Sequence, residues 1–400
     1  MVDWTRRMAR RARDGGDPLG GILALANAEG VLNFSGGFPD PSLFPTGELG
    51  DITRRLLDDD PGVALQYAPS NGIESARHAM IDWLSDEQGH RAADDELMIT
   101  SGGIDAVTLI ARTMLDPGDV VLVEEPTYLG AVSGFAAHDP VLRGVELDED
   151  GLDVGALGEL LAAAPVPPKL LYTIPDHQNP SGRSLSEVRR SELVELCRRH
   201  GVLIVEDVAY RHLGFDGTAS PSLWSIGPDV VVQIGTFSKV FFPGVRLGWA
   251  SGPAEIVAKL AVAKQNSDQC AGALGQRMLE EYLRGGLLDA HLPKARALYR
   301  DRAAAVDAAL RAHFAELGEW TAPAGGFFTW VRLPGVDTTE LAAEAAEHAV
   351  AYVPGAGFFA ERPDAEHLRL SFSRIEVPEI EQGIAALGAA VRGLGSGARR

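Results

Sequence analysis

The sequence predicts an α/β protein with a mostly parallel sheet sandwiched by helices, followed by a smaller α+β domain at the C-terminus. Between about residues 95 and 250, short runs rich in Val, Ile and Leu alternate with helical patterns. From about residue 290 a long helical region, a hairpin pattern and further short strands follow. Strand–helix alternation is typical of parallel sheets, and the later mixture is typical of an α+β unit.

Six apolar runs have the length and composition of strands that are buried on both faces. They are Leu97–Thr100, Val120–Glu124, Leu170–Ile174, Leu203–Glu206, Val230–Gly235 and Leu247–Ala250. A helix is expected at Ile104–Met114, where apolar residues recur at helical spacing. A second helix is expected at Leu185–His200. Ser184 and Glu187 are placed as its capping box, and Gly201 marks its end.

The C-terminal part begins with a long helix, expected at Leu292–Ala315. Trp320–Leu333 is predicted to form a hairpin around Gly325 and Gly326, and Leu368–Ser373 a further strand. We predict three parts: an N-terminal arm with part of the small domain at 1–45, the large domain at 46–290, and the small domain at 291–400.

The composition limits the function classes. The 400 residues carry a formal net charge of −20, which argues against nucleic acid or an anionic membrane as a partner. The two cysteines, Cys197 and Cys270, lie far apart, so no disulfide framework or metal site is predicted. No stretch reaches the roughly 18 uncharged apolar residues of a membrane span. The arginines between residues 6 and 13 fit a solvated first helix or, alternatively, a transit peptide, and we expect a cytoplasmic protein.

Lysine is rare in this chain, and Lys239 has unusual surroundings. Between Val230 and Ala254 the only charged residues are Lys239 and Arg246, whereas the other four lysines are interpreted as surface or strand-end residues. Burial in an apolar stretch favours the neutral amine, and a neutral amine forms a Schiff base with an aldehyde. The alternative is a lysine that reaches solvent from the end of a strand.

Groups suited to binding phosphate lie close to Lys239 in the sequence. The hydroxyls of Thr236 and Ser238 and the guanidinium of Arg246 can bind phosphate oxygens. Gly102 and Gly103 follow a predicted strand and open a helix, where backbone N–H groups bind phosphate; alternatively this is an ordinary strand–helix turn. An imine-forming lysine beside a phosphate site is the arrangement that pyridoxal phosphate needs.

Several side chains at predicted strand ends fit the same cofactor. Asp207 can pair with a pyridine nitrogen, or can cap the following turn. Tyr210 and Asn179 can bind a ring hydroxyl, although an Asn before Pro is also common in turns. Tyr128 can stack on the ring or be a core residue, and Arg369 can bind a carboxylate or be an exposed residue of an edge strand.

Together these residues resemble the fold-type I pyridoxal-phosphate enzymes, and specifically the class I/II aminotransferases. The subgroup that they resemble includes 2-aminoadipate, kynurenine and aromatic aminotransferases and the C-terminal domains of MocR-type regulators. The most specific motifs are Tyr172–Gly182, which reads YTIPDHQNPSG, and Gly235–Trp249, which reads GTFSKVFFPGVRLGW. The resemblance extends from about Asn33 to Ser373.

The resemblance implies a role for each matching residue. Lys239 holds the cofactor and acts as the base, and Asp207 faces the ring nitrogen. Asn179 and Tyr210 face the ring hydroxyl, and Tyr128 stacks on the ring. The phosphate lies among a group of small residues and one arginine: Gly102, Gly103, Thr236, Ser238 and Arg246. Arg369 and the backbone at Gly37 hold the substrate carboxylate. Tyr67 reaches the phosphate of the neighbouring subunit, which implies a homodimer with shared active sites.

The sequence departs from the subgroup at three places. Gly103 and Ile104 stand where the subgroup often has Ser-Gln, and His177 stands where an aromatic residue is common. Glycines occur around Asp17–Leu23, where 2-aminoadipate-type enzymes carry an arginine that reads a distal carboxylate. This last departure argues against an acidic side chain on the preferred donor.

The sequence therefore predicts an aminotransferase that moves an amino group between an L-amino acid and a 2-oxo acid, with 2-oxoglutarate as the expected acceptor. An alternative is another pyridoxal-phosphate reaction on an amino acid: β-elimination, decarboxylation or oxidation. A further alternative is a non-catalytic ligand sensor like the MocR effector domain. Those regulators carry a winged helix ahead of this domain, and the acidic chain has only about thirty residues before the first motif.

Overall fold

The computed structural model describes residues 2–9, 12 and 30–397. Its centre is an eight-stranded sheet. In spatial order the strands are β2 (Leu97–Thr100), β9 (Gly248–Ser251), β8 (Val231–Thr236), β7 (Leu203–Asp207), β6 (Leu170–Thr173), β3 (Val120–Glu125), β4 (Val141–Asp148) and β5 (Gly151–Leu152). The five strands from β8 to β4 run parallel, and β9 is antiparallel to both of its neighbours. The mostly parallel sheet that the sequence predicts is confirmed.

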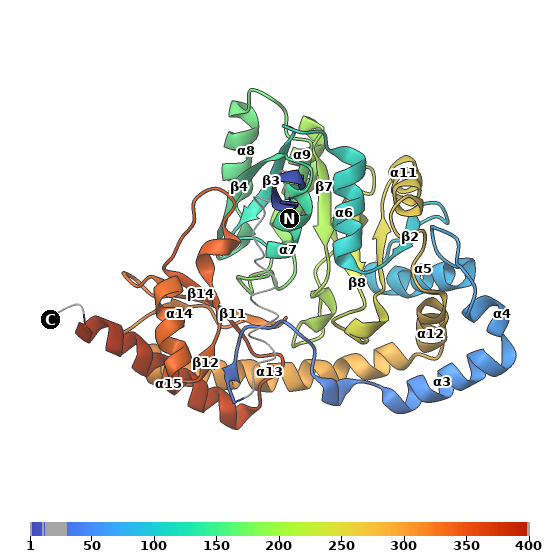
Figure 1. Cartoon of the computed structure of the whole chain (residues 1–400). Helices are drawn as coiled ribbons and strands as arrows, with labels where there is room; N and C mark the ends of the chain where they lie inside the picture. Colours follow the sequence, from blue (N-terminus) through green and yellow to red (C-terminus); the bar gives the residue numbers. More distant parts are fainter. Residues whose placement is uncertain (1, 10–11, 13–29, 398–400) are drawn as a thin grey trace.

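Helices cover both faces of this sheet (Figure 1). One group of helices packs together on one face: α6 (Gly103–Met114), α7 (Leu129–Ala136) and α11 (Ala254–Gln265). Another group packs together on the opposite face: α8 (Val154–Ala163), α9 (Glu187–His200) and α10 (Leu223–Ile226). The four residues of β2 and of β6 are all buried, as a strand with two covered faces requires.

The remaining helices of this part lie beyond β2. They are α3 (Thr46–Asp59), α4 (Pro61–Ala64), α5 (Glu74–Gln88) and α12 (Ala273–Arg284). α5 contacts β2, and α12 packs on α3, α4 and α5. Four short 3-10 helices interrupt the loops: η2 (Pro41–Leu43), η3 (Arg211–Leu213), η4 (Pro243–Val245) and η5 (Gly355–Phe358).

A smaller sheet follows the long helix α13 (Leu287–Phe314). Its strands, in order, are β10 (Glu319–Trp320), β11 (Phe328–Arg332), β14 (His367–Ser371) and β13 (Val353–Pro354), all antiparallel. Helices α14 (Thr338–Glu347) and α15 (Val377–Gly397) pack with it, and β1 (Leu32–Asn33) pairs in parallel with β12 (Val350–Ala351). The smaller α+β part at the C-terminus is thereby confirmed.

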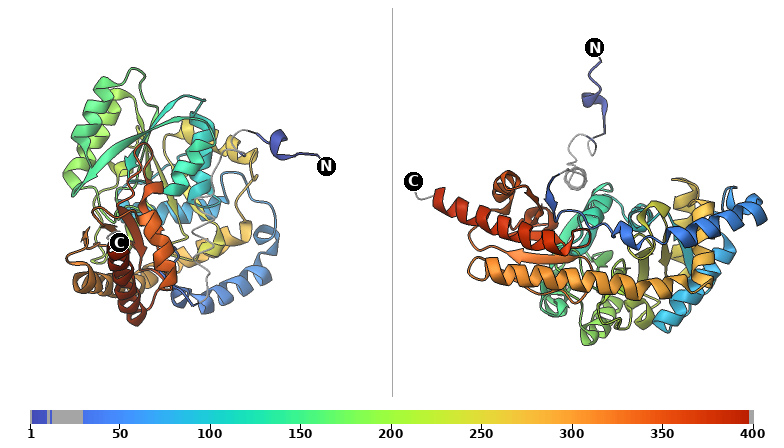
Figure 2. Two further views of the ribbon diagram at one scale, coloured as in Figure 1. Left: turned by 60° about the vertical axis from the view of Figure 1, so that its left-hand side comes forward. Right: turned by 90° about the horizontal axis from the view of Figure 1, so that it is seen from below.

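Helix α13 connects the two parts of the molecule. It contacts α12 at one end and packs along α15 at the other, and it runs across both parts in the right-hand view of Figure 2. The helix expected at Leu292–Ala315 begins earlier, at Leu287, and continues through Pro293. The predicted domain boundary after residue 290 falls inside this helix, and the proposed division at 45 and 290 stays a prediction.

Some local expectations are wrong. The N-cap of α9 is Ser186, without a side-chain cap, and not the predicted pair Ser184 and Glu187. The Ser184 hydroxyl instead accepts a hydrogen bond from the His177 amide, because the chain before α9 is folded back on the 175–184 loop. Strand β4 was not expected, because only one of its eight residues is fully buried and the alternating pattern is weak.

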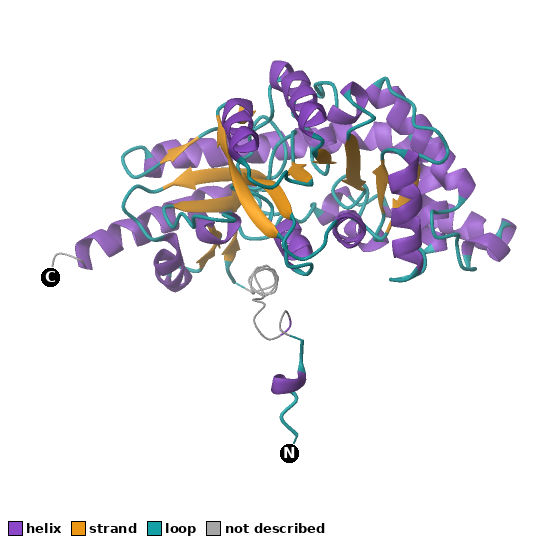
Figure 3. Ribbon diagram, turned by 90° about the horizontal axis from the view of Figure 1, so that it is seen from above, coloured by secondary structure: helices purple, strands orange, loops and turns teal. Residues whose placement is uncertain are grey.

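At the N-terminus, residues 2–9 stand apart from the body of the chain in Figure 3 and contain the short helix η1 (Thr5–Arg7). The rest of the expected first helix, and the glycines around 17–23, lie outside the described residues. None of the helices in the described part of the chain is both long and apolar enough to span a bilayer.

Candidate active site

The carboxyl ends of β3, β6, β7 and β8 meet at one edge of the sheet, because these strands are parallel. A cavity of about 470 Å³ lies at this edge. All of the predicted site residues except Gly102 and Tyr67 line it. They are Gly37, Gly103, Tyr128, Asn179, Asp207, Tyr210, Thr236, Ser238, Lys239, Arg246 and Arg369. The sheet thus gathers side chains that are far apart in the sequence.

Lys239 lies just beyond β8 and is partly buried in this cavity. Its Nζ donates a hydrogen bond of 2.8 Å to the carbonyl oxygen of Gly37, and no carboxylate of the described residues forms an ion pair with it. Burial, together with the positive charge of Arg369, lowers the pKa of Lys239 to about 8. Near neutral pH a far larger share of this amine is therefore neutral and able to attack an aldehyde than for an ordinary lysine.

Asp207 is the last residue of β7 and is buried. Its carboxylate accepts hydrogen bonds from the Tyr172 hydroxyl at 2.7 Å and from the Ala209 amide at 3.1 Å. Burial raises the pKa of Asp207, whereas the Tyr172 hydroxyl opposes that increase. A buried carboxylate without a cationic partner is suited to hold a protonated ring nitrogen.

Three polar side chains surround the middle of the cavity. Tyr128 precedes α7, Asn179 lies in the loop after β6, and Tyr210 follows β7. Burial raises the pKa of Tyr128 to about 12 and raises the pKa of Tyr210 further, so both phenols stay protonated. The Asn179 Oδ1 accepts a hydrogen bond of 2.8 Å from Arg369. This leaves the amide NH₂ of Asn179, which also interacts with the Tyr210 phenol, to donate toward a ligand.

A cradle for an anion lies beside Lys239. The Thr236 hydroxyl donates to Ser238 Oγ at 2.9 Å, and Arg246 Nη1 reaches the same Ser238 oxygen at 3.3 Å. Gly102 has a positive φ of 103° and caps the N-terminus of α6, and a Cβ at this position would lie 2.7 Å from Arg246 Nη2. Two hydroxyls, a guanidinium and a helix N-terminus together suit a phosphate.

Lys264 corrects the sequence interpretation that only Lys239 is enclosed. Lys264 has no exposed surface, and its Nζ contacts Asp105 at 2.9 Å, Asp268 at 2.8 Å and the Ser101 hydroxyl at 3.0 Å. The interpretation of Lys264 as a surface residue is therefore wrong. Asp105 lies on α6, far from Lys264 in the sequence. Asp268 lies only four residues after Lys264, but such a pair is equally typical of an exposed helix face, so the sequence did not indicate burial.

Arg369 on β14 is the cation opposite Lys239. It is buried, and burial lowers its pKa to about 10. Its Nη2 donates to the carbonyl of Ser35 at 2.7 Å, while its guanidinium lies 4.2 Å from the Phe328 ring centre and 5.0 Å from that of Phe358. Its Nε is buried and has no hydrogen-bond partner among the described residues. The alternative of an exposed arginine is thereby excluded, and the group is placed to bind a carboxylate.

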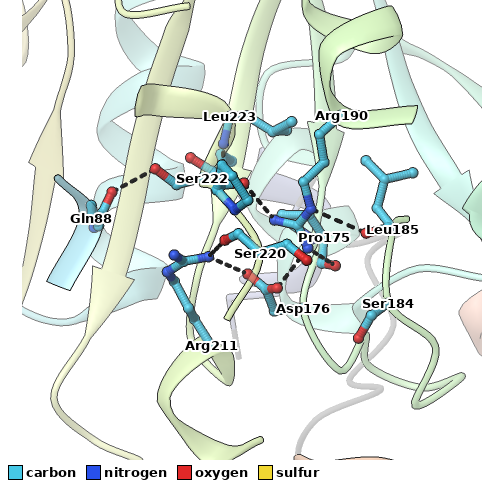
Figure 4. A network of polar contacts seen from close by, with 12 residues as sticks. Gln88, Pro175, Asp176, Ser184, Leu185, Arg190, Arg211, Ser220, Ser222 and Leu223 are labelled. Atoms are coloured by element: carbon cyan, nitrogen blue, oxygen red, sulfur yellow. Dashed lines mark hydrogen bonds and ion pairs between the residues drawn. The ribbon is translucent and has the colours of Figure 1, made fainter. Parts of the chain in front are cut away.

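A buried network fixes the two loops that carry Asn179 and Tyr210 (Figure 4). Asp176 accepts hydrogen bonds from Arg190 at 2.6 Å and from Arg211 at 3.2 Å. Arg190 also donates to the carbonyls of Leu185 and Pro175, and Arg211 donates to that of Ser220. The network therefore ties the loop after β6 to the loop after β7 at the edge of the cavity.

Sequence reasoning missed the apolar wall of the cavity. Five of its members come from four separate segments: Phe38, Ile104, Val107, Leu129 and Phe328. Phe328 follows the hairpin glycines that the sequence did single out, and a Cβ on Gly37 would lie 2.6 Å from its ring. Tyr172 was also missed, although it opens one of the two motifs. Only the fold reveals that its hydroxyl reaches Asp207.

The comparisons with known proteins agree with this geometry. Residues 37–387 match the family described as aminotransferase class I and II. The chain belongs to this family. The aromatic-amino-acid aminotransferase 1 of Thermococcus litoralis is 35% identical over 93% of this chain and 90% of its own length. The 2-aminoadipate transaminase of Thermus thermophilus is 35% identical over 93% of both chains.

A solved structure of similar length has the same fold. The kynurenine aminotransferase of Pyrococcus horikoshii, in complex with PMP, superposes with a TM-score of 0.94 at 34% identity and covers 98% of each chain. This aminotransferase therefore has the fold of type I pyridoxal-phosphate enzymes and uses pyridoxal phosphate. Its own residues fit that cofactor: a weakly basic lysine, a buried carboxylate and an anion cradle lie around one cavity.

Proposed function

We propose that this aminotransferase takes the amino group from an L-amino acid with an apolar or aromatic side chain and transfers it to a 2-oxo acid. The apolar wall of the cavity carries the proposal on the donor, because it offers no partner for a charged side chain. Among the described residues, the cations that line the cavity are Lys239, Arg246 and Arg369, and each already has a role. The relatives named for aromatic amino acids and kynurenine favour the same class.

For the site residues we propose the following division of work. Bound pyridoxal phosphate supplies an aldehyde and an electron-withdrawing ring. Lys239 would hold the aldehyde carbon, and as a free amine its Nζ would take up the proton of the substrate Cα. Asp207 holds the ring nitrogen, Asn179 and Tyr210 hold the ring hydroxyl, and Tyr128 stacks on the ring.

The remaining site residues bind the charged ends of cofactor and substrate. The anion cradle of Gly102, Gly103, Thr236, Ser238 and Arg246 binds the phosphate. Arg369, with the backbone at Gly37, binds the carboxylate of the donor and later that of the acceptor, because both half-reactions share one site. The acceptor expected from the sequence, 2-oxoglutarate, stays a prediction, because its second carboxylate finds no further cation among the described residues that line the cavity.

We propose a homodimer as the active form. Four large apolar side chains on α3, on α4 and just after α4 are exposed: Leu57, Val63, Leu65 and Tyr67. Tyr67 is 76% exposed and lies outside its own cavity, so it is free to reach the phosphate of a second copy. An exposed apolar cluster of this kind is typical of an interface. The cytoplasmic location stays a prediction.

Single-turnover measurements test the donor class. The enzyme, loaded with pyridoxal phosphate, is mixed with one amino acid at a time and without a 2-oxo acid. Phe, Leu and kynurenine are expected to yield one equivalent of 2-oxo acid per site, and Glu and Asp to react at least about tenfold more slowly. Release of carbon dioxide, or of ammonia or peroxide alongside the 2-oxo acid, would identify one of the alternative reactions. Faster reaction of Glu than of Phe would contradict the apolar donor.

Mixing two inactive variants tests the shared site. Lys239→Ala removes the lysine of a subunit's own site, and Tyr67→Ala removes the tyrosine that a subunit contributes to the site of its partner. A hybrid dimer should therefore contain one intact site. Recovery of about a quarter of the wild-type activity after subunit exchange supports the proposal. No recovery in a preparation that sedimentation shows to be mixed dimers contradicts it.

A further inference from the structure

Tyr172 occupies a fixed place behind the proposed ring-nitrogen partner. It lies in β6 and is fully buried, and its backbone pairs with Val205 of β7, two residues before Asp207. The ring meets Phe135 of α7 edge-on, with 5.8 Å between the ring centres. Two strands and a helix therefore hold the hydroxyl at 2.7 Å from Asp207 Oδ2.

The Tyr172 hydroxyl matters more to Asp207 than any single donor matters to two other buried carboxylates, Glu124 and Asp176. Glu124 accepts hydrogen bonds from Thr173, Gln178 and a backbone amide, and Asp176 accepts from two arginines. Asp207 has the Tyr172 hydroxyl and one backbone amide, and no cation of the described residues pairs with it. Tyr172 is thus the one side chain seen to donate to Asp207 in the part of the chain that the structure describes.

We propose that Tyr172 is a positioning residue of the aminotransferase reaction, whose hydroxyl orients the Asp207 carboxylate and keeps it ionised for a protonated ring nitrogen. The inference rests on the proposed role of Asp207 and deepens it. A phenol suits this task because it donates a hydrogen bond without adding a positive charge, which an arginine would place beside a protonated ring.

The hydrogen bond has a consequence that depends on pH. Burial alone raises the pKa of Asp207, and the Tyr172 hydroxyl counteracts it by favouring the ionised form. The pKa of Tyr172 is itself well above its ordinary value, because of burial and the nearby Asp207, so the donor stays protonated. Without the hydroxyl, Asp207 takes up a proton at a higher pH. The loss of cofactor affinity should then be largest at low pH and should decrease as pH rises.

The test measures the dissociation constant of pyridoxal phosphate from pH 6 to pH 9 for the wild type and Tyr172→Phe. This substitution removes the hydroxyl and conserves the ring. The dissociation constant is expected to increase by about tenfold at pH 6 and to change little at pH 9. The matched control is Tyr352→Phe, which removes an equally buried hydroxyl that donates to the carbonyl of Thr338 in the small domain. Its dissociation constant should equal that of the wild type at every pH.

Two further results decide between the inference and its premise. The dissociation constant of Tyr172→Phe is divided by that of the wild type at each pH. A ratio that is the same at every pH would mean a structural role only, and would overturn the inference. The Asp207→Asn variant should bind the cofactor weakly, and adding Tyr172→Phe to it should introduce no pH dependence. If Asp207→Asn binds as tightly as the wild type, the proposed role of Asp207 fails instead.

Discussion

Lys239 and Lys264 are two enclosed lysines with opposite surroundings. Lys264 has no exposed surface and contacts two carboxylates, so its charge is balanced inside the protein. Lys239 donates to the Gly37 carbonyl and has a second cation, Arg369, in the same cavity. Enclosure alone therefore does not make a lysine reactive. A low pKa arises where burial is combined with positive charge and without a paired acid.

Two buried carboxylates repeat the same contrast. Asp176 and Asp207 follow or end neighbouring strands, and both are buried. Burial opposes ionisation at both positions, but the charges of Arg190 and Arg211 lower the pKa of Asp176, whereas the pKa of Asp207 is raised. The paired carboxylate holds loops together, and the unpaired one is left to respond to a ligand.

The largest expected effect separates the two lysines by activity. Lys239→Ala removes both the group that holds the cofactor and the base, so transamination should fall by at least about a thousandfold. Rates of the single-turnover reaction with Phe measure this loss. A Lys239→Ala enzyme that keeps a tenth of the wild-type rate would refute the assignment of Lys239.

The free energy of unfolding should depend more on Lys264 than on Lys239. Lys264→Met leaves Asp105 and Asp268 without their cation, so the free energy of unfolding should fall by about 2–3 kcal/mol. Urea unfolding of the apoenzyme measures it. The matched control is Lys259→Met, an exposed position on the same helix, with an expected change below about 0.5 kcal/mol. Equal losses in the two variants would contradict the account of Lys264.

A smaller effect is expected on the titration of Lys239. The rate at which the apoenzyme binds pyridoxal covalently should rise with pH, with a midpoint at about 8, and level off at higher pH, where the amine is neutral. Arg369→Met removes a positive charge and should raise this midpoint by up to about one pH unit, whereas Arg369→Lys keeps the charge. A wild-type midpoint near the ordinary lysine value would show that the cavity does not perturb Lys239.

Much of this architecture was predictable because the central strands are buried on both faces. Their short apolar runs, most of them rich in Val, Ile and Leu, place β2, β3, β6, β7, β8 and β9 within a residue or two. Strand β4 escaped prediction because it lies near the edge of the sheet and is mostly half-buried, so its pattern is weak. The capping box at Ser184 failed because a tertiary contact to His177 competes for that hydroxyl.

For the site, sequence reasoning found residues that sit in short motifs and missed those that depend on distant partners. Asn179, Asp207 and Lys239 follow apolar runs, and their place at the sheet edge follows from parallel strands. The pairing of Lys264 with Asp105, and of Tyr172 with Asp207, joins residues from separate segments. Local patterns carry no signal for such contacts.

The most direct test of the central claim locates the lysine that holds the cofactor. Enzyme incubated with pyridoxal phosphate is reduced with borohydride, digested and analysed by mass spectrometry. We expect one phosphopyridoxyl group per chain, on the peptide that contains Lys239, with the Lys264 peptide unmodified. A label on Lys264, or labels spread over the exposed lysines with Lys239 unmodified, would contradict the claim that the unpaired lysine of the cavity is the reactive one.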